Sequence, residues 1–180
     1  MPSVAAKPFR SYPWFVRLLF WKQRRIFGRV LDPSLYWARS PWVFAAFALL
    51  YGALERRSSP LSPALRSLVM VRISQINHCA FCVDINSAML EKRGVSEQKI
   101  SRLAEWRQTD LFAPDECLAL EYAEATSLNQ VDEDLRARLK ERWDDDAIVE
   151  LTGLIAFQNL SAKFNSALDV PAQGFCRLPR

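Results

Sequence analysis

Ser74-Gln-Ile-Asn77-His78-Cys79-Ala-Phe-Cys82-Val-Asp-Ile-Asn86 is the most informative segment of this chain, because it holds a Cys-x-x-Cys pair and the only histidine. Two thiols three residues apart on a helix lie on one face, close enough to form a disulfide. If Asn77 caps this helix, both sulfurs lie in its first turn or just beyond it, where the pKa of a cysteine thiol is lowered. The segment therefore predicts redox chemistry. The alternative is two small, buried, apolar residues on a core helix.

The segments on either side of this pair predict helices and no strand. Capping residues followed by proline mark helix starts at residues 32–33, 40–41 and 62–63. Apolar residues follow helical spacing over 63–76, and no alternating strand pattern is present. The helix that holds the cysteines is expected to run to about Lys92, with Gly94 as a left-handed stop. Further helices are expected over residues 96–106, 114–127, 132–143 and 145–168. The fold class expected is all-α.

Two of the predicted helices carry further expectations. Residues 42–54 are almost wholly apolar but too few to span a bilayer, so we expect a buried core helix. Three acids, Asp144-Asp145-Asp146, precede the last helix. Negative charge stabilises a helix N-terminus, so a capping role is favoured over metal binding.

Composition excludes several classes of site. The 180 residues suit one domain, or one domain with an arm, and the five glycines are too scattered to form a phosphate-binding loop. A single histidine excludes any site that needs two imidazoles, and allows a Ser-His-Asp triad only with His78 as its base. A zinc ribbon needs a second close cysteine pair, but Cys117 and Cys176 are far apart. We expect no metal and no organic cofactor.

The N-terminal arm, residues 1–35, differs from the helical domain expected over 36–180. Its first thirty residues contain no acid and seven basic residues interleaved with aromatic ones: Lys7, Arg10, Arg17, Lys22, Arg24, Arg25 and Arg29. One interpretation is an interfacial helix on anionic lipid. The other is an arm that packs on its own body or on a neighbouring subunit. No nucleic-acid-binding module accompanies the basic residues, so no nucleic-acid partner is expected.

Location follows from the cysteines and the N-terminus. No convincing cleavable signal precedes the body, and a working dithiol suits a reducing compartment. The expected location is cytoplasmic, peripheral to the membrane if the arm binds lipid.

Residues 67–86, which read Ser67-Leu-Val-Met-Val-Arg-Ile-Ser-Gln-Ile-Asn-His-Cys79-Ala-Phe-Cys82-Val-Asp-Ile-Asn86, resemble the signature of the carboxymuconolactone decarboxylase and alkylhydroperoxidase D superfamily. The resemblance covers about residues 45–170. It implies an alkylhydroperoxidase D-like helical bundle, assembled as trimers or hexamers. It also implies that Cys82 attacks a hydroperoxide or disulfide substrate, that Cys79 resolves the product, and that an external thiol reductant restores the pair.

The chain departs from the peroxidase members at two supporting positions. Those members carry a glutamate twelve residues before the first cysteine and a histidine four after the second; here the positions hold Ser67 and Asn86. Asn86 can donate a hydrogen bond to a thiolate but cannot shuttle a proton. His78, four residues before Cys82, would replace the histidine if both were helical; otherwise it is an exposed first-turn residue. A carboxylate from another helix is a further candidate: Glu121, Glu124 or Glu150.

Two functions follow for this chain. The first is a thiol peroxidase or thiol–disulfide oxidoreductase that uses Cys79 and Cys82. The second is a relay-deficient protein of the same fold that binds a ligand or partner, or senses redox state, without turnover. The decarboxylase branch fits less well, because its reaction needs an acid such as histidine to protonate carbon and has no use for a cysteine pair.

Overall fold

The protein is built from α-helices and two short 3₁₀ helices, with no strand among residues 4–176, which are those described by the computed structural model. The all-α prediction is confirmed. The helices are α1 (Trp14–Phe27), α2 (Asp32–Trp37), α3 (Pro41–Leu54), α4 (Pro63–Ile76), α5 (Ala80–Lys92), α6 (Glu97–Ser101), α7 (Pro114–Ser127), α8 (Glu133–Arg142) and α9 (Asp145–Ala167); the 3₁₀ helices are Phe9–Ser11 and Leu103–Gln108.

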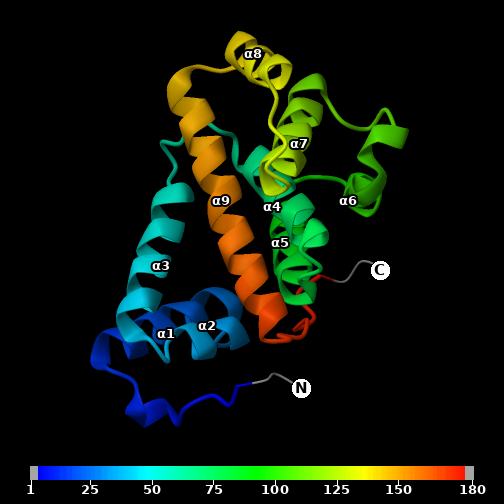
Figure 1. Ribbon diagram of the computed structural model, residues 1–180. Helices are drawn as coiled ribbons and strands as arrows, with labels where there is room; N and C mark the ends of the chain where they lie inside the picture. The colour runs from blue at the N-terminus through cyan, green and yellow to red at the C-terminus, as the bar shows by residue number, and fades with distance from the viewer. Residues whose placement is uncertain (1–3, 177–180) are drawn as a thin grey trace.

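Helix α4 lies at the centre of the bundle, with α5, α7 and α9 packed around it (Figure 1). Two hydrophobic clusters meet on α4. Val69 and Ile73 face α7 and α9, whereas Leu68 and Val71 belong to the cluster that contains α6 and the 3₁₀ helix Leu103–Gln108. Because the buried side chains of α4 belong to both clusters, burying them requires neighbouring helices on more than one side, which agrees with the central place of α4.

Most helix ends form where the sequence predicts them. Ser62, Asp132 and Asp144 each accept a hydrogen bond from a backbone N–H in the first turn that follows, and Gly94 has φ of 84°. The capping role predicted for the acids before α9 is thus confirmed at Asp144. The helix predicted over 96–106 is instead two pieces, α6 and the 3₁₀ helix Leu103–Gln108, which are separated at Arg102, where ψ is 0°.

The prediction that Asn77 caps the cysteine helix is wrong. Asn77 ends α4, and its side chain donates to the carbonyl of Ile73 at 2.9 Å, so it is satisfied by the helix before it. His78 follows in the left-handed region with φ of 50°, and Cys79 is the residue that caps α5. Since His78 lies between the two helices, it is not one helical turn from Cys82 as expected.

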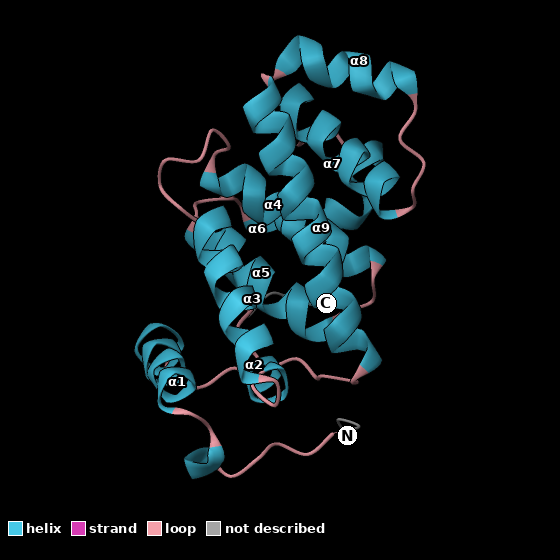
Figure 2. Cartoon of the chain, turned by 60° about the vertical axis from the view of Figure 1, so that its left-hand side comes forward, coloured by secondary structure: helices cyan, strands magenta, loops and turns pink. Residues whose placement is uncertain are grey.

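The prediction that residues 42–54 form a buried core helix is also wrong in part. Helix α3 forms, but it lies at the edge of the bundle and packs on α9 and α1 from one side only (Figure 2). Phe44 and Leu54 are buried, whereas Trp42 is 77% exposed and Leu49 is 76% exposed. The largely apolar sequence of α3 therefore does not ensure that both of its faces are buried.

The N-terminal segment packs on the helical body through aromatic side chains. Tyr12 and Phe20 are buried beside Phe44 of α3, and Trp37 stacks on Phe164 of α9 with ring centroids 3.7 Å apart. Its helices α1 and α2 lie across one end of α3 and α9 (Figure 1). Within residues 4–176, no helix combines the length and apolar character needed to cross a membrane.

Candidate active site

The two cysteines lie at the N-terminus of α5 and are paired as a disulfide, with their Cα atoms 5.2 Å apart. Cys79 is the N-cap, and its Sγ accepts the backbone N–H of Cys82 at 3.2 Å. Once the bond is reduced, this N–H and the positive end of the helix favour a thiolate at Cys79. Both residues are buried, Cys79 at 1% and Cys82 at 2% exposure.

Asn165 of α9 contacts the second cysteine. Its Nδ2 donates a hydrogen bond to Cys82 Sγ at 3.2 Å, and its Oδ1 is buried without a partner among the residues described. A donor at this distance favours the charged form of a reduced Cys82. Sequence reasoning did not find Asn165. The only signal was a polar residue, like Gln158 two turns earlier, on a buried and mostly apolar face of α9.

A cavity of about 370 Å³ opens beside Cys82. Its walls come from α1, α2, α3, α5 and α9, and Cys82 lines it whereas Cys79 does not. A solute in the cavity therefore contacts Cys82 and not Cys79. The lining includes seven aromatic side chains, which are Phe27, Trp37, Phe44, Phe47, Tyr51, Phe81 and Phe157.

A small polar network forms the wall of the cavity beyond the sulfur. Asn86 Nδ2 and Gln158 Nε2 both donate to Ser74 Oγ, at 3.2 and 2.9 Å, and Ser74 in turn donates to the carbonyl of Met70 at 2.6 Å. Asn86 lines the cavity, but its hydrogen bond goes to Ser74 and not to a cysteine. Amides and a hydroxyl fill this wall, and none of them is an acid or base near neutral pH.

Ser67 belongs to a different cluster, where α4 meets the ends of α3 and α5. Its Oγ accepts a hydrogen bond from Arg93 Nη1 at 2.7 Å, and Arg93 also pairs with Glu55. The hydroxyl of Ser67 is therefore engaged by Arg93 and does not contact the cysteines.

Tyr51 lies in the cavity wall near Glu55. Burial, reinforced by the nearby Glu55, raises the pKa of Tyr51 to about 12, so the phenol stays protonated.

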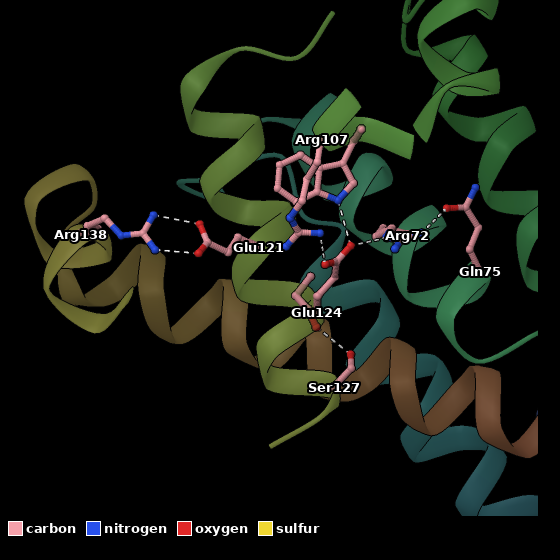
Figure 3. Close-up of polar contacts among 9 residues, drawn as sticks. Arg72, Gln75, Arg107, Glu121, Glu124, Ser127 and Arg138 are labelled. Atoms are coloured by element: carbon pink, nitrogen blue, oxygen red, sulfur yellow. Dashed lines mark hydrogen bonds and ion pairs between the residues drawn. The ribbon is translucent and has the colours of Figure 1, made fainter. Parts of the chain in front are cut away.

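His78 is exposed in the turn between α4 and α5, and no hydrogen bond joins its imidazole to either cysteine among the residues described. The three glutamates considered from the sequence are engaged elsewhere. Glu124 accepts hydrogen bonds from Arg72, Arg107 and Trp106 (Figure 3). Glu121 forms a bidentate ion pair with Arg138 (Figure 3). Glu150 pairs with Arg56. The structure thus pairs Cys79 with Cys82 and places Asn86 in the same cavity as Cys82, and among residues 4–176 none of the acid–base candidates from the sequence hydrogen-bonds to the cysteines.

The C-terminal strap, residues 170–176, covers the cysteine pair from outside. Buried Asp84 of α5 accepts the backbone N–H groups of Gln173 and Cys176, both at 2.8 Å, and the Gln173 amide exchanges two hydrogen bonds with Asp32. Val170 of the strap packs in the same cluster as both cysteines. The strap therefore contributes to the burial of the cysteine pair.

A metal is not suggested by the donor set. Within residues 4–176 no group of three or more His, Cys, Asp or Glu side chains is arranged to hold a metal ion. Cys117 and Cys176 are half-buried and unpaired with other cysteines.

Comparison with known proteins identifies the relatives of this chain. Residues 41–125 match the carboxymuconolactone decarboxylase family. The uncharacterized protein YnjA of Escherichia coli (strain K12) is 49% identical over 174 residues, which are 96% of each chain. Two solved structures share the fold. An uncharacterized peroxidase-related protein with an alkylhydroperoxidase AhpD core, from Ralstonia eutropha JMP134, superposes with a TM-score of 0.87 at 21% identity, covering 97% of this chain and 94% of that one.

The second structure is a cysteine-to-alanine variant of the debrominase Bmp8 in complex with 2,3,4-tribromopyrrole. It has a TM-score of 0.82 at 19% identity, with the same coverage of both chains, 97% and 94%. At sequence identities of 21% and 19%, the two structures show that the fold is shared and nothing more.

Proposed function

This chain belongs to the carboxymuconolactone decarboxylase and alkylhydroperoxidase D-like superfamily, and on that premise we propose that it is a thiol-dependent peroxidase or thiol–disulfide oxidoreductase. One observation carries the proposal. Cys82 lines the cavity and its Sγ accepts a hydrogen bond from Asn165, while Cys79, its disulfide partner, does not line the cavity. Cys82 is then the attacking thiol and Cys79 the resolving one. A reducing compartment such as the cytoplasm would return the disulfide of Cys79 and Cys82 to two thiols after each reaction.

The first step is attack by the Cys82 thiolate on the outer oxygen of a hydroperoxide in the cavity. The sulfur–oxygen bond forms as the oxygen–oxygen bond breaks, giving a sulfenic acid on Cys82 and an alcohol after the leaving oxygen takes a proton from water. Asn165 holds the sulfur through Nδ2. Its Oδ1 is buried without a partner among the residues described, and because Asn165 lines the cavity, this oxygen would accept the O–H of a hydroperoxide or of a water molecule there.

The second step is attack by Cys79 on the sulfenic acid, which forms the disulfide and releases water. An external thiol reductant then attacks Cys82 from the cavity and displaces Cys79, and a second thiol completes the reduction. The N–H of Cys82 that contacts Cys79 Sγ stabilises the leaving thiolate, and a stabilised thiolate leaves faster.

The cavity favours an apolar substrate with an aromatic or bulky organic group. Its aromatic walls offer stacking and apolar contact, which hydrogen peroxide cannot use. Cumene hydroperoxide is a suitable probe of this preference. The tribromopyrrole held by the debrominase Bmp8 is also aromatic, so the same compound is a useful ligand to include beside it.

A second candidate function is ligand binding or redox sensing with slow turnover. The observation that favours it is that, within residues 4–176, no acidic or basic side chain hydrogen-bonds to either sulfur: the contacts of Asn86 and Asn165 are amide hydrogen bonds, and His78 is exposed. General acid–base catalysis contributes about a hundredfold or more in many enzymes, so its loss slows the reaction without affecting ligand binding.

The two candidates are separated by the rate of hydroperoxide consumption with a dithiol reductant in excess. The first predicts steady turnover, faster with cumene hydroperoxide than with hydrogen peroxide, and lost in Cys82→Ser. The second predicts that wild-type protein reacts no faster than a free thiol, although the cavity still binds 2,3,4-tribromopyrrole or cumyl alcohol in a calorimetric titration.

A further inference from the structure

Helix α1 presents an apolar stripe away from the body of the protein. Val16 and Phe20 are buried, whereas Trp14 is 72% exposed, and Leu18 and Trp21 follow at exposures of 55% and 54%. These three residues are spaced by four and three positions, so they lie on one face of the helix, opposite the buried one. Large apolar side chains arranged in this way are unusual on a surface that meets only water.

The stripe continues onto α3. Phe15 of α1 stacks on Trp42 of α3 with ring centroids 5.1 Å apart, so α1 meets the N-terminal end of α3 at the edge of the bundle (Figure 2). The outer side of α3 adds Val43, Leu49 and Leu50 to this surface. We name the exposed residues of the two helices the α1–α3 face: Trp14, Leu18, Trp21, Trp42, Val43, Leu49 and Leu50.

Basic residues flank the α1–α3 face and acids are nearly absent. Residues 1–54 contain one acid, Asp32, and eight basic residues, namely Lys7, Arg10, Arg17, Lys22, Arg24, Arg25, Arg29 and Arg39. On α1, Arg17 and Arg24 flank one side of the stripe and Lys22 the other, while Arg25 lies over the ring of Trp21 at 4.7 Å. Tryptophan with arginine and lysine is the combination found where proteins contact lipid head groups.

We propose that the α1–α3 face docks on an anionic lipid surface, with α1 lying in the plane of the interface. Charge distinguishes this occupant from a second copy of the chain. A symmetric dimer through the same face would bring two sets of arginines together with no acid of α1 or α3 to meet them, which costs free energy. Anionic lipid supplies the missing negative charge and accepts the tryptophans.

The cavity also reaches the surface beside this face. Lys22 and Ile26 of α1 and Gly52 of α3 line the cavity and are exposed. Docking would therefore place the mouth of the cavity next to the bilayer. The docking itself does not depend on the proposed redox function, because it needs neither cysteine.

The test is co-sedimentation of the full-length protein with vesicles of phosphatidylcholine alone and of phosphatidylcholine mixed with phosphatidylglycerol. The expected result is pelleting with the anionic vesicles that falls as salt is raised. Arg17→Gln, Arg24→Gln and Arg25→Gln combined should weaken the partition coefficient on the order of a hundredfold. The matched control, Arg136→Gln with Lys140→Gln on exposed positions of α8, should bind like wild type.

A second set of variants tests the apolar stripe. Trp14→Ser, Leu18→Ser and Leu49→Ser remove exposed side chains and should abolish pelleting while the circular dichroism spectrum stays unchanged. Val149→Ser and Leu160→Ser, at comparably exposed positions of α9, are the control and should have no effect. The Cys79→Ser, Cys82→Ser double variant should bind as wild type, so failure of the redox proposal leaves this result unaltered.

Three results would overturn the proposal. They are no pelleting with anionic vesicles, pelleting that the serine variants on α1 and α3 do not reduce, and a fall in molecular mass by light scattering when those serines are introduced. The last result would assign the α1–α3 face to contact between copies of the chain.

Discussion

Asn165 connects the sulfur of Cys82 to the last helix of the bundle. Since its amide donates to Sγ at 3.2 Å, we expect Asn165→Ala to destabilise the Cys82 thiolate. A hydrogen bond to a charged group is worth about 1.5–3 kcal/mol, so hydroperoxide reduction should slow by at least about tenfold. The pH midpoint for alkylation of Cys82 by iodoacetamide, measured in the Cys79→Ser background, should move upward.

The control for this prediction is Asn159→Ala. Asn159 lies on the same helix but hydrogen-bonds Ser127 and Asn77, away from the sulfur. An unchanged alkylation profile in Asn165→Ala would show that the amide does not act on Cys82.

Asn86 occupies the place where peroxidase members carry histidine, and it lines the cavity one turn after Cys82. Asn86→His should therefore increase the rate of hydroperoxide reduction near neutral pH by about tenfold, because imidazole can move a proton and an amide cannot. Asn86→Gln is the matched control, with an amide of different length. Stopped-flow rates with cumene hydroperoxide from pH 5 to 9 measure both.

Single residues show where sequence reasoning succeeds and where it does not. The Cys-x-x-Cys spacing was sufficient to place two sulfurs together at a helix N-terminus. It could not reveal Asn165, because that contact joins positions 83 residues apart and depends on how α9 crosses α5. The spacing also could not show that Asn77 ends α4, since asparagine can cap either end of a helix.

Helices α4 and α7 and the 3₁₀ helix Leu103–Gln108 are joined by the carboxylate of Glu124. Burial raises the pKa of Glu124, but hydrogen bonds from Trp106, Arg107 and Arg72 outweigh burial and leave the pKa below its ordinary value of 4.5. A lowered pKa in the folded state gives stability that is present above the ordinary value and lost as pH falls through the folded value. The wild type should therefore lose stability as pH falls below about 4.5.

Glu124→Gln removes the charge and should lower the free energy of unfolding at pH 7 by about 2 kcal/mol. Below pH 4.5 the variant should lose less further stability than wild type. Urea titrations across this pH range give the comparison, with Glu133→Gln, at an exposed position of α8, as the control. Parallel curves for Glu124→Gln and wild type at low pH would count against this role.

The C-terminal strap is fastened to α5 by Asp84, which accepts two of its backbone N–H groups. Asp84→Ala should release residues 170–176, speeding amide hydrogen exchange there, and should let bulky disulfide reagents reach the reduced cysteines. Asp84→Asn keeps one carbonyl acceptor and should show a smaller effect. Asp110→Ala at an exposed position should show none. Exchange in the strap that stays as slow in Asp84→Ala as in wild type would argue that the strap is held by its apolar contacts.

Helix boundaries were largely predictable because capping residues and proline act locally. Ser62 and Asp132 cap where the pattern indicates, and Gly94 supplies the left-handed stop. Burial was less predictable. The uniformly apolar sequence of α3 indicates a covered helix, but burial depends on how many neighbours pack against it, and α3 has them on one side only.

The molecule as a whole joins the N-terminal helices and the helical body around one apolar cavity. Seven aromatic side chains from these two parts line its walls, and Cys82 is the cysteine of the pair that lines it. This arrangement comes from long-range packing that composition cannot indicate, although the resemblance over the central helices gave the bundle itself. Assembly into trimers or hexamers stays a prediction.

The central claim is that Cys82 attacks and Cys79 resolves. It is tested most directly by treating reduced Cys79→Ser and Cys82→Ser proteins with one equivalent of cumene hydroperoxide and locating the added oxygen by peptide mass spectrometry. The account predicts a sulfenic acid on Cys82 in Cys79→Ser, trapped by dimedone, and no comparable oxidation of Cys79 in Cys82→Ser. Equal oxidation of both cysteines, or oxidation of Cys79 alone, would contradict it.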